Sequence, residues 1–130
     1  MESDDRTLFE LMDFGKISEV HKTFVDYFTA YDFLRMKATC DTGAKMAGDL
    51  MSQALALHPS APLESIKDAF YIYLCDVRDM CESYAAAAQA FQQGQSGIGT
   101  KMASRGNESA TSMNKHSDTL IDLMNNLSKR

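Results

Sequence analysis

The chain of 130 residues has no tryptophan, only two prolines and only three cysteines. It also lacks a long uncharged apolar run, whereas a membrane-spanning helix needs about 20 such residues. An odd number of cysteines cannot all pair within one chain, so we expect no complete disulfide framework. The formal net charge of −5 argues against a basic nucleic-acid-binding protein. With 45% hydrophobic residues, the chain has enough apolar side chains for a folded core.

The first residues, Met1–Asp5, are mostly acidic or polar. A secretory signal peptide needs a basic start followed by an apolar stretch of about 7–15 residues, and neither is present. Unpaired cysteines suit a reducing compartment. We therefore expect a cytoplasmic protein, or alternatively one that is exported without a cleaved signal peptide.

Apolar side chains recur at helical spacing through the N-terminal half of the chain. A short helix ends near Gly15, and the following segment repeats apolar residues every three or four positions. Gly43 and Gly48 weaken this pattern, because each glycine costs about 1 kcal/mol relative to alanine inside a helix. We predict helices at 17–40 and 43–57, with a kink or a break between them.

The two prolines fall together at Pro59 and Pro62 and mark the clearest break in the chain. The longest periodic run follows and predicts a helix at 62–93. Its two core heptad positions are apolar throughout: Leu63, Ile66, Phe70, Tyr73, Val77, Met80, Tyr84, Ala87 and Phe91. The flanking positions are mostly small or apolar, which favours a helix packed among several neighbours over a two-stranded coiled coil.

Glycine and glutamine interrupt the pattern after residue 92, and the chain stays polar to about residue 114. We expect a flexible segment at 94–118 and a final amphipathic helix at 112–128. The sequence thus predicts an all-α, single-domain antiparallel helical bundle over 1–130, with about four helices and a short N-terminal helix. The core should include Phe24, Phe28, Tyr31, Leu34, Phe70, Val77, Tyr84 and Phe91.

No motif indicates catalysis, nucleotide binding or a metal centre. The glycine segment before Lys101 lacks the Gly-Lys-Ser/Thr order of a phosphate-binding loop. The di-iron signature Glu-x-x-His is absent. An acidic row falls mostly at solvent-facing heptad positions: Asp76, Asp79 and Glu82. The three histidines are scattered along the chain: His21, His58 and His116. We therefore expect no enzymatic activity and no cofactor, metal or nucleotide.

Some large apolar residues lie off the main stripes, and they are our candidates for a partner-binding surface: Tyr71, Ile72, Val25 and Phe33. The leading hypothesis is a non-catalytic protein–protein interaction module that binds another protein, or itself, through apolar helix faces. Adaptors, chaperone-like proteins and oligomerising subunits belong to this class. Binding of nucleic acid is not expected, because basic residues form no stripe interleaved with exposed aromatics.

Two alternatives remain open at this point. The first is a secreted or secretion-associated helical factor whose mobile C-terminal segment is recognised. The helical-hairpin proteins of type VII secretion have a comparable size and helicity, but their Trp-x-Gly turn and C-terminal Tyr-x-x-x-Asp/Glu signal are absent here. The second is a small-ligand binder or an enzyme whose site forms only in three dimensions, with His21 or His58 beside a cysteine or carboxylate.

Overall fold

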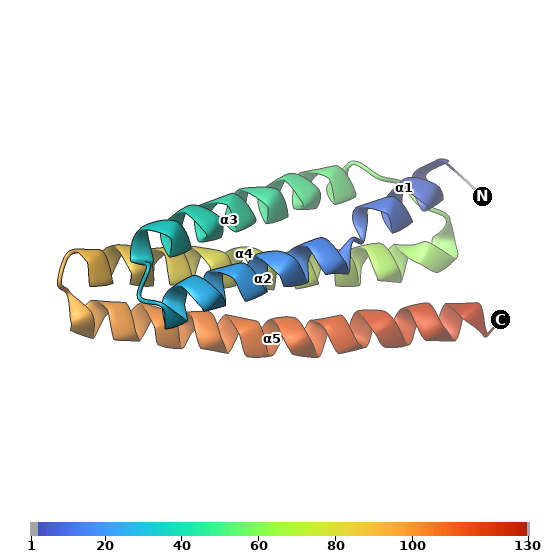
Figure 1. Cartoon of the computed structure of the whole chain (residues 1–130). Helices are drawn as coiled ribbons and strands as arrows, with labels where there is room; N and C mark the ends of the chain where they lie inside the picture. The colour runs from blue at the N-terminus through green and yellow to red at the C-terminus, as the bar shows by residue number, and fades with distance from the viewer. Residues whose placement is uncertain (1–2, 130) are drawn as a thin grey trace.

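The computed structural model describes residues 3–129, and all regular structure in that range is helical (Figure 1). Successive long helices run antiparallel, which confirms the predicted all-α bundle. Within residues 3–129, no helix combines the length and the apolarity that crossing a membrane requires. The elements are α1 (Ser3–Leu11), α2 (Phe14–Thr29), α3 (Phe33–Leu55), the 3₁₀ turn η1 (Ala61–Leu63), α4 (Glu64–Gln92) and α5 (Ser96–Ser128).

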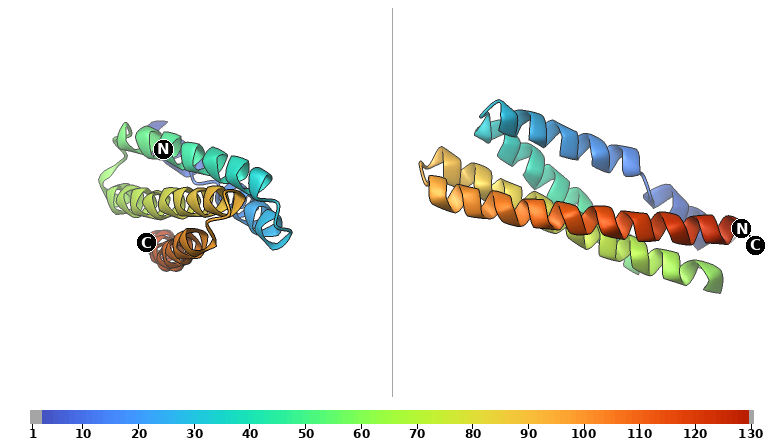
Figure 2. Two further views of the ribbon diagram at one scale, coloured as in Figure 1. Left: turned by 90° about the vertical axis from the view of Figure 1, so that its left-hand side faces the viewer. Right: turned by 90° about the horizontal axis from the view of Figure 1, so that it is seen from below.

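Helix α4 is the centre of the bundle. It packs closely against α3 on one side and α5 on the other, and α2 lies beside this layer (Figure 2). Its buried residues match the predicted heptad positions from Ile66 to Ala87, and only Phe91, near the C-terminal end, is half-buried. The small residues Ala85 and Ala88 are also buried, so α4 is covered on more than one side.

Helix α5 packs on α4 along a narrow line in which every seventh residue is buried: Gly99, Gly106, Met113 and Leu120. Gly99 lies against the ring of Phe91, and Gly106 lies against the ring of Tyr84. A Cβ atom would be 2.7 Å from the Phe91 ring at the first position and 2.8 Å from the Tyr84 ring at the second. Glycine is therefore required at both positions, because the aromatic rings occupy the space of a side chain.

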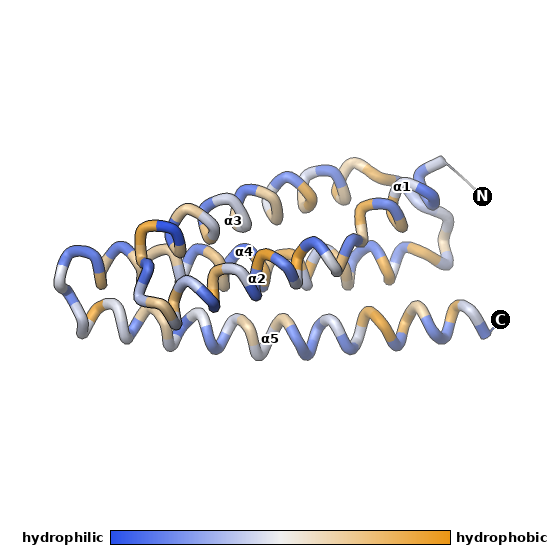
Figure 3. The backbone as a smooth tube through the Cα atoms, viewed as in Figure 1, coloured by the Kyte–Doolittle hydropathy of each residue, from blue (hydrophilic) through white to orange (hydrophobic). Residues whose placement is uncertain are grey.

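The predicted start of the last helix at residue 112 is wrong, because α5 already begins at Ser96. The connection from α4 is a tight turn in which Gly94 has a φ of 73°. The N-terminal half of α5 is largely polar, and its apolar residues gather toward the C-terminus (Figure 3). Two of its buried positions are glycines, which give no hydrophobic signal, so the sequence pattern there indicates a loop.

Of the kink or break predicted near residues 41–42, the break is wrong, because α3 runs unbroken through Gly43. A Cβ at Gly43 would lie 2.8 Å from Cys81 Sγ and 2.9 Å from a methyl group of Val20, so this glycine is where three helices meet. The chain breaks earlier, between α2 and α3. Tyr31 and Leu34 lie at that turn and are 78% and 70% exposed, so both were wrongly placed in the core.

The first helix is fixed to the turn before α4 by its acidic residues. The carboxylate of Asp5, which is buried, accepts hydrogen bonds from Ser60 N at 2.7 Å and from Ser60 Oγ at 2.8 Å. Asp4 accepts one from His58 N at 2.7 Å. Ser60 thus bonds across to α1 and makes no side-chain capping bond to the turn that follows it. These acids anchor α1 to a segment more than fifty residues away.

We predict opposite effects for two glycine-to-alanine substitutions inside helices. Gly106→Ala should lower the free energy of unfolding by about 1–3 kcal/mol, because its Cβ collides with the Tyr84 ring. Gly48→Ala should raise it by about 0.5–1 kcal/mol, because nothing lies within 4 Å and alanine favours the helix. Urea unfolding followed by circular dichroism measures both; equal stabilisation by the two substitutions would contradict the close α4–α5 packing.

Candidate functional site

The long helices form a ring that is closed on three sides and open on the fourth. Helix α2 packs on α3, α3 on α4 and α4 on α5, but α5 does not come back into close contact with α2. A groove of about 440 Å³ lies between these last two helices, and we call it the α2–α5 seam. Its lining comprises Phe14, Ile17, Ser18, His21, Lys22, Val25 and Asp26 from α2, Tyr73 from α4, and Met113, Asn114 and Ser117 from α5.

The seam stays open because α4 holds its two neighbours at different distances. Toward α2, aromatic rings stand between the helices: Phe14 and Tyr73 have ring centroids 5.4 Å apart, and those of Phe24 and Tyr84 are 5.0 Å apart. Toward α5, glycine lets the backbone approach the Tyr84 ring directly. Helix α5 therefore lies closer to α4 than α2 does.

The seam is amphipathic. Ile17 and Met113 are buried in its walls, and Val25 is 41% exposed on its rim. Six of the eleven lining residues are polar or charged: Ser18, His21, Lys22, Asp26, Asn114 and Ser117. His21 is half-buried, and its ring centroid is 5.1 Å from that of Phe24. Burial lowers the pKa of His21 below its usual 6.5, so the imidazole is neutral at neutral pH.

The four predicted partner-binding residues occupy different parts of the bundle. Val25 lines the seam, and Phe33 stacks on Phe91 with ring centroids 5.0 Å apart, near the end of the bundle where both turns lie. Ile72 is 47% exposed on α4, and the adjacent Tyr71 is half-buried against the core. Only Val25 belongs to the seam, and a binding role for all four residues stays a prediction. The remaining seam residues were missed because most of them are polar, and because those of α5 fall in the segment 94–118 that was predicted to be flexible.

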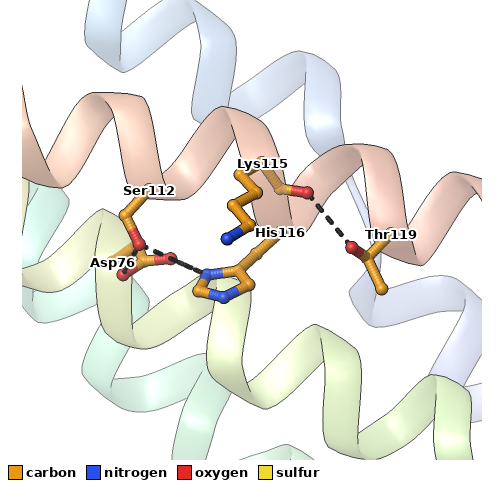
Figure 4. Close-up of polar contacts among 5 residues, drawn as sticks. All are labelled: Asp76, Ser112, Lys115, His116 and Thr119. Carbon is orange, nitrogen blue, oxygen red and sulfur yellow. Dashed lines mark hydrogen bonds and ion pairs between the residues drawn. The ribbon is translucent and has the colours of Figure 1, made fainter.

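Asp76, Ser112 and His116 form a polar cluster between α4 and α5 (Figure 4). Ser112 Oγ donates to Asp76 at 3.1 Å and lies 3.4 Å from His116 Nδ1, while Asp76 also contacts Nδ1 directly. In a catalytic triad the acid and the serine contact opposite ring nitrogens. Here both meet the same nitrogen, so the arrangement joins two helices and does not activate a nucleophile.

This cluster corrects the prediction that the acidic row on α4 simply faces solvent, because the side chain of Asp76 is only 15% exposed. No local sequence pattern indicates this pairing, since Asp76 and His116 are 40 residues apart. Within the described residues there is no group of three or more potential metal ligands.

The other reactive side chains show no sign of activation. Cys40 and Cys81 are buried, and burial raises the pKa of each thiol to about 12, which keeps them protonated and poorly nucleophilic. No disulfide joins cysteines in the described part of the chain. His21 shares the seam with Asp26, but the groove is open, and no hydrogen bond joins the two side chains within residues 3–129.

We predict that His21 makes the fold less stable in acid. The folded-state pKa lies below that of the unfolded chain, so the unfolded chain binds more protons, and stability falls as the pH drops through 6.5 and below. His21→Gln should therefore lose less stability than the wild type between pH 7.5 and pH 5. Urea midpoints at both pH values give the comparison. His58→Gln, at an exposed position outside the seam, is the control. An identical loss in wild type and His21→Gln would exclude this effect.

Three comparisons bear on what this arrangement resembles. Protein-family models, curated proteins and solved structures give no match to this chain. The functional interpretation therefore depends on the residues of the chain itself, and above all on the α2–α5 seam.

Proposed function

We propose that this protein is a non-catalytic interaction module that binds an amphipathic helix of a protein partner in the α2–α5 seam. The observation that supports it is the incomplete ring: two helices form the walls, α4 forms the floor, and the remaining side is open. Grooves of this kind accept a helix whose apolar residues recur at three- and four-residue spacing. The proposal covers an adaptor, a chaperone-like protein or an oligomerising subunit.

The length of the seam suits a helix better than a compact ligand. On α2 its lining extends from Phe14 to Asp26, a span of about 18 Å at 1.5 Å per residue. On α5 the helical spacing continues beyond Ser117 to Ile121, which is 45% exposed, and to the half-buried Met124. A partner helix of three or four turns would bury these side chains.

The rim also indicates the charge pattern of the partner. Lys22 and Asp26 are one helical turn apart on the exposed edge of α2, and in the described residues they form no ion pair with each other. A partner helix that carries an acidic and a basic residue one turn apart could pair with both. Such rim pairs contribute little affinity but help to fix the orientation of the partner.

A non-catalytic role agrees with the chemistry of the remaining polar groups. The hydroxyl of Ser112 in the α4–α5 cluster donates a hydrogen bond to Asp76, and the two buried thiols stay protonated. For its location we propose the cytoplasm, with export without a cleaved signal peptide as the alternative.

We predict that an amphipathic peptide binds the seam and that one arginine blocks it. The probe is a synthetic three-turn helix with leucines at helical spacing and with Glu and Lys one turn apart. The backbone amide chemical shifts of Ser18, His21 and Asn114 should change when the peptide is added to isotopically labelled protein. Ser117→Arg, in the seam wall, should weaken binding at least tenfold, because the long side chain occupies the groove.

Ser104→Arg is the matched control, because Ser104 is an exposed serine of the same helix outside the seam lining. Chemical-shift changes outside the seam, or an equal loss of peptide affinity in both variants, would contradict the proposal. In a second experiment, the wild type and Ser117→Arg each serve as the bait in an affinity purification from the native source. Light scattering of the purified samples then shows whether a partner is retained by the wild type alone. A strict monomer with no partner retained would also count against an interaction module.

The alternative of a secretion-associated factor depends on mobility of residues 94–118. Residues 96–118 belong to α5, which packs on α4, and beyond its first turn the amides of a helix are hydrogen-bonded within it. We therefore predict slow hydrogen exchange at residues 101–118 in the isolated protein, slower than in the exposed turn at 92–95. Exchange at the rate of an unfolded peptide across the whole segment would favour the alternative instead.

A further inference from the structure

The same helix-ending motif occurs twice at one end of the bundle (Figure 1). At the end of α4, Gly94 N bonds to Phe91 O at 3.1 Å, and the next amide, that of Gln95, bonds to Ala90 O at 2.8 Å. At the end of α2, Tyr31 N bonds to Phe28 O at 3.0 Å, and the next amide bonds to Tyr27 O at 2.9 Å. Both are Schellman motifs, in which one residue adopts a left-handed conformation.

The two turns differ in the residue at the left-handed position. Gly94 has a φ of 73°, which glycine adopts without strain. Tyr31 has a φ of 57°, and it is the only non-glycine residue with a positive φ among those described. For a tyrosine this conformation crowds Cβ against the backbone and is unfavourable. Folding alone therefore favours glycine at position 31.

The ring of Tyr31 contributes little to the core that would offset this strain. The residue is 78% exposed, and its ring lies edge-on to Phe33, with ring centroids 6.2 Å apart. Leu34, one turn further along, is 70% exposed. A shallow hollow of about 370 Å³ lies beside the ring. We call this surface the apolar tip: Val25, Phe28, Thr29, Tyr31 and Leu34.

We propose that the apolar tip is a self-association surface, at which the Tyr31 ring of one copy fills the hollow beside Tyr31 of a second copy. A projecting side chain and a hollow next to each other on one surface are what a two-fold symmetric contact needs, because each copy then supplies both parts. Self-association also accounts for a strained tyrosine at this position, since the left-handed turn makes its ring project from the bundle.

Charge favours a second copy at this place. Two chains with a net charge of −5 repel each other over most of their surfaces. Around the tip, residues 22–35 have no net charge: Asp32 pairs with Arg35 at 3.5 Å, and Asp26 lies one helical turn from Lys22. The neighbouring turn at 92–98 carries no charged residue. A contact made by one ring and one hollow from each copy should bury less than the roughly 1,200–2,000 Å² of a stable interface, so the dimer should be weak and should form only at high protein concentration.

Sedimentation equilibrium from about 10 µM to 1 mM tests this proposal with a variant that should fold better than the wild type. Tyr31→Gly relieves the left-handed strain, so its urea midpoint should rise. At the same time it removes the projecting ring, so dimerisation should weaken at least tenfold. Tyr31→Phe keeps the ring and should dimerise like the wild type. Ile72→Ser is the control, because Ile72 is an exposed apolar residue of α4 outside the tip.

The wild type should show a monomer–dimer equilibrium that Tyr31→Gly loses and Ile72→Ser keeps. A wild type that stays monomeric at 1 mM, or a Tyr31→Gly variant that dimerises equally well, would overturn the proposal. Neutral phosphatidylcholine vesicles are added to the monomeric wild type as a second probe. Binding to them that Tyr31→Gly abolishes would assign the tip to a lipid surface and would also overturn self-association. None of these outcomes depends on a peptide binding in the α2–α5 seam.

Discussion

The size of the side chains that separate α4 from its neighbours determines the shape of this protein. Aromatic rings hold α2 away from α4, while Gly99 and Gly106 let α5 lie directly against Phe91 and Tyr84. Packed interiors leave little room for adjustment, so these spacings are fixed once the residues are chosen. A bundle with equal spacings would close its ring of helices. This bundle keeps one side open, and the α2–α5 seam is the result.

The same spacing explains which parts of the fold the sequence predicts. Helix α4 is read correctly because its core heptad positions carry large apolar residues from Ile66 to Met80. The sequence pattern predicts a loop for the first half of α5, because glycine occupies the buried positions 99 and 106. A glycine that allows close approach and a glycine that ends a helix are identical in the sequence. Only the partner ring across the interface distinguishes them, and that information is not local.

The turn between α2 and α3 is missed for the opposite reason. Glycine or proline would mark such a turn, but the chain places Tyr31 there, and the apolar spacing continues through it. The candidate site shows a similar limit. Val25 was recognised because it lies off the main stripe, whereas His21 and Asn114 reach the seam only through the packing of α2 and α5. The pairing of Asp76 with His116 likewise requires the register between α4 and α5.

The two ends of the bundle are formed by different segments of the chain. Residues near the N-terminus, with Asp4 and Asp5 bonded to the loop before α4, lie at the same end as the last turn of α5, whereas both tight turns lie at the opposite end. A purification tag, a fluorescent protein or a surface linker attached at either terminus therefore projects away from Tyr31. The protein can be immobilised by either end while its turns stay accessible, which gives the chain a fixed orientation in a binding assay.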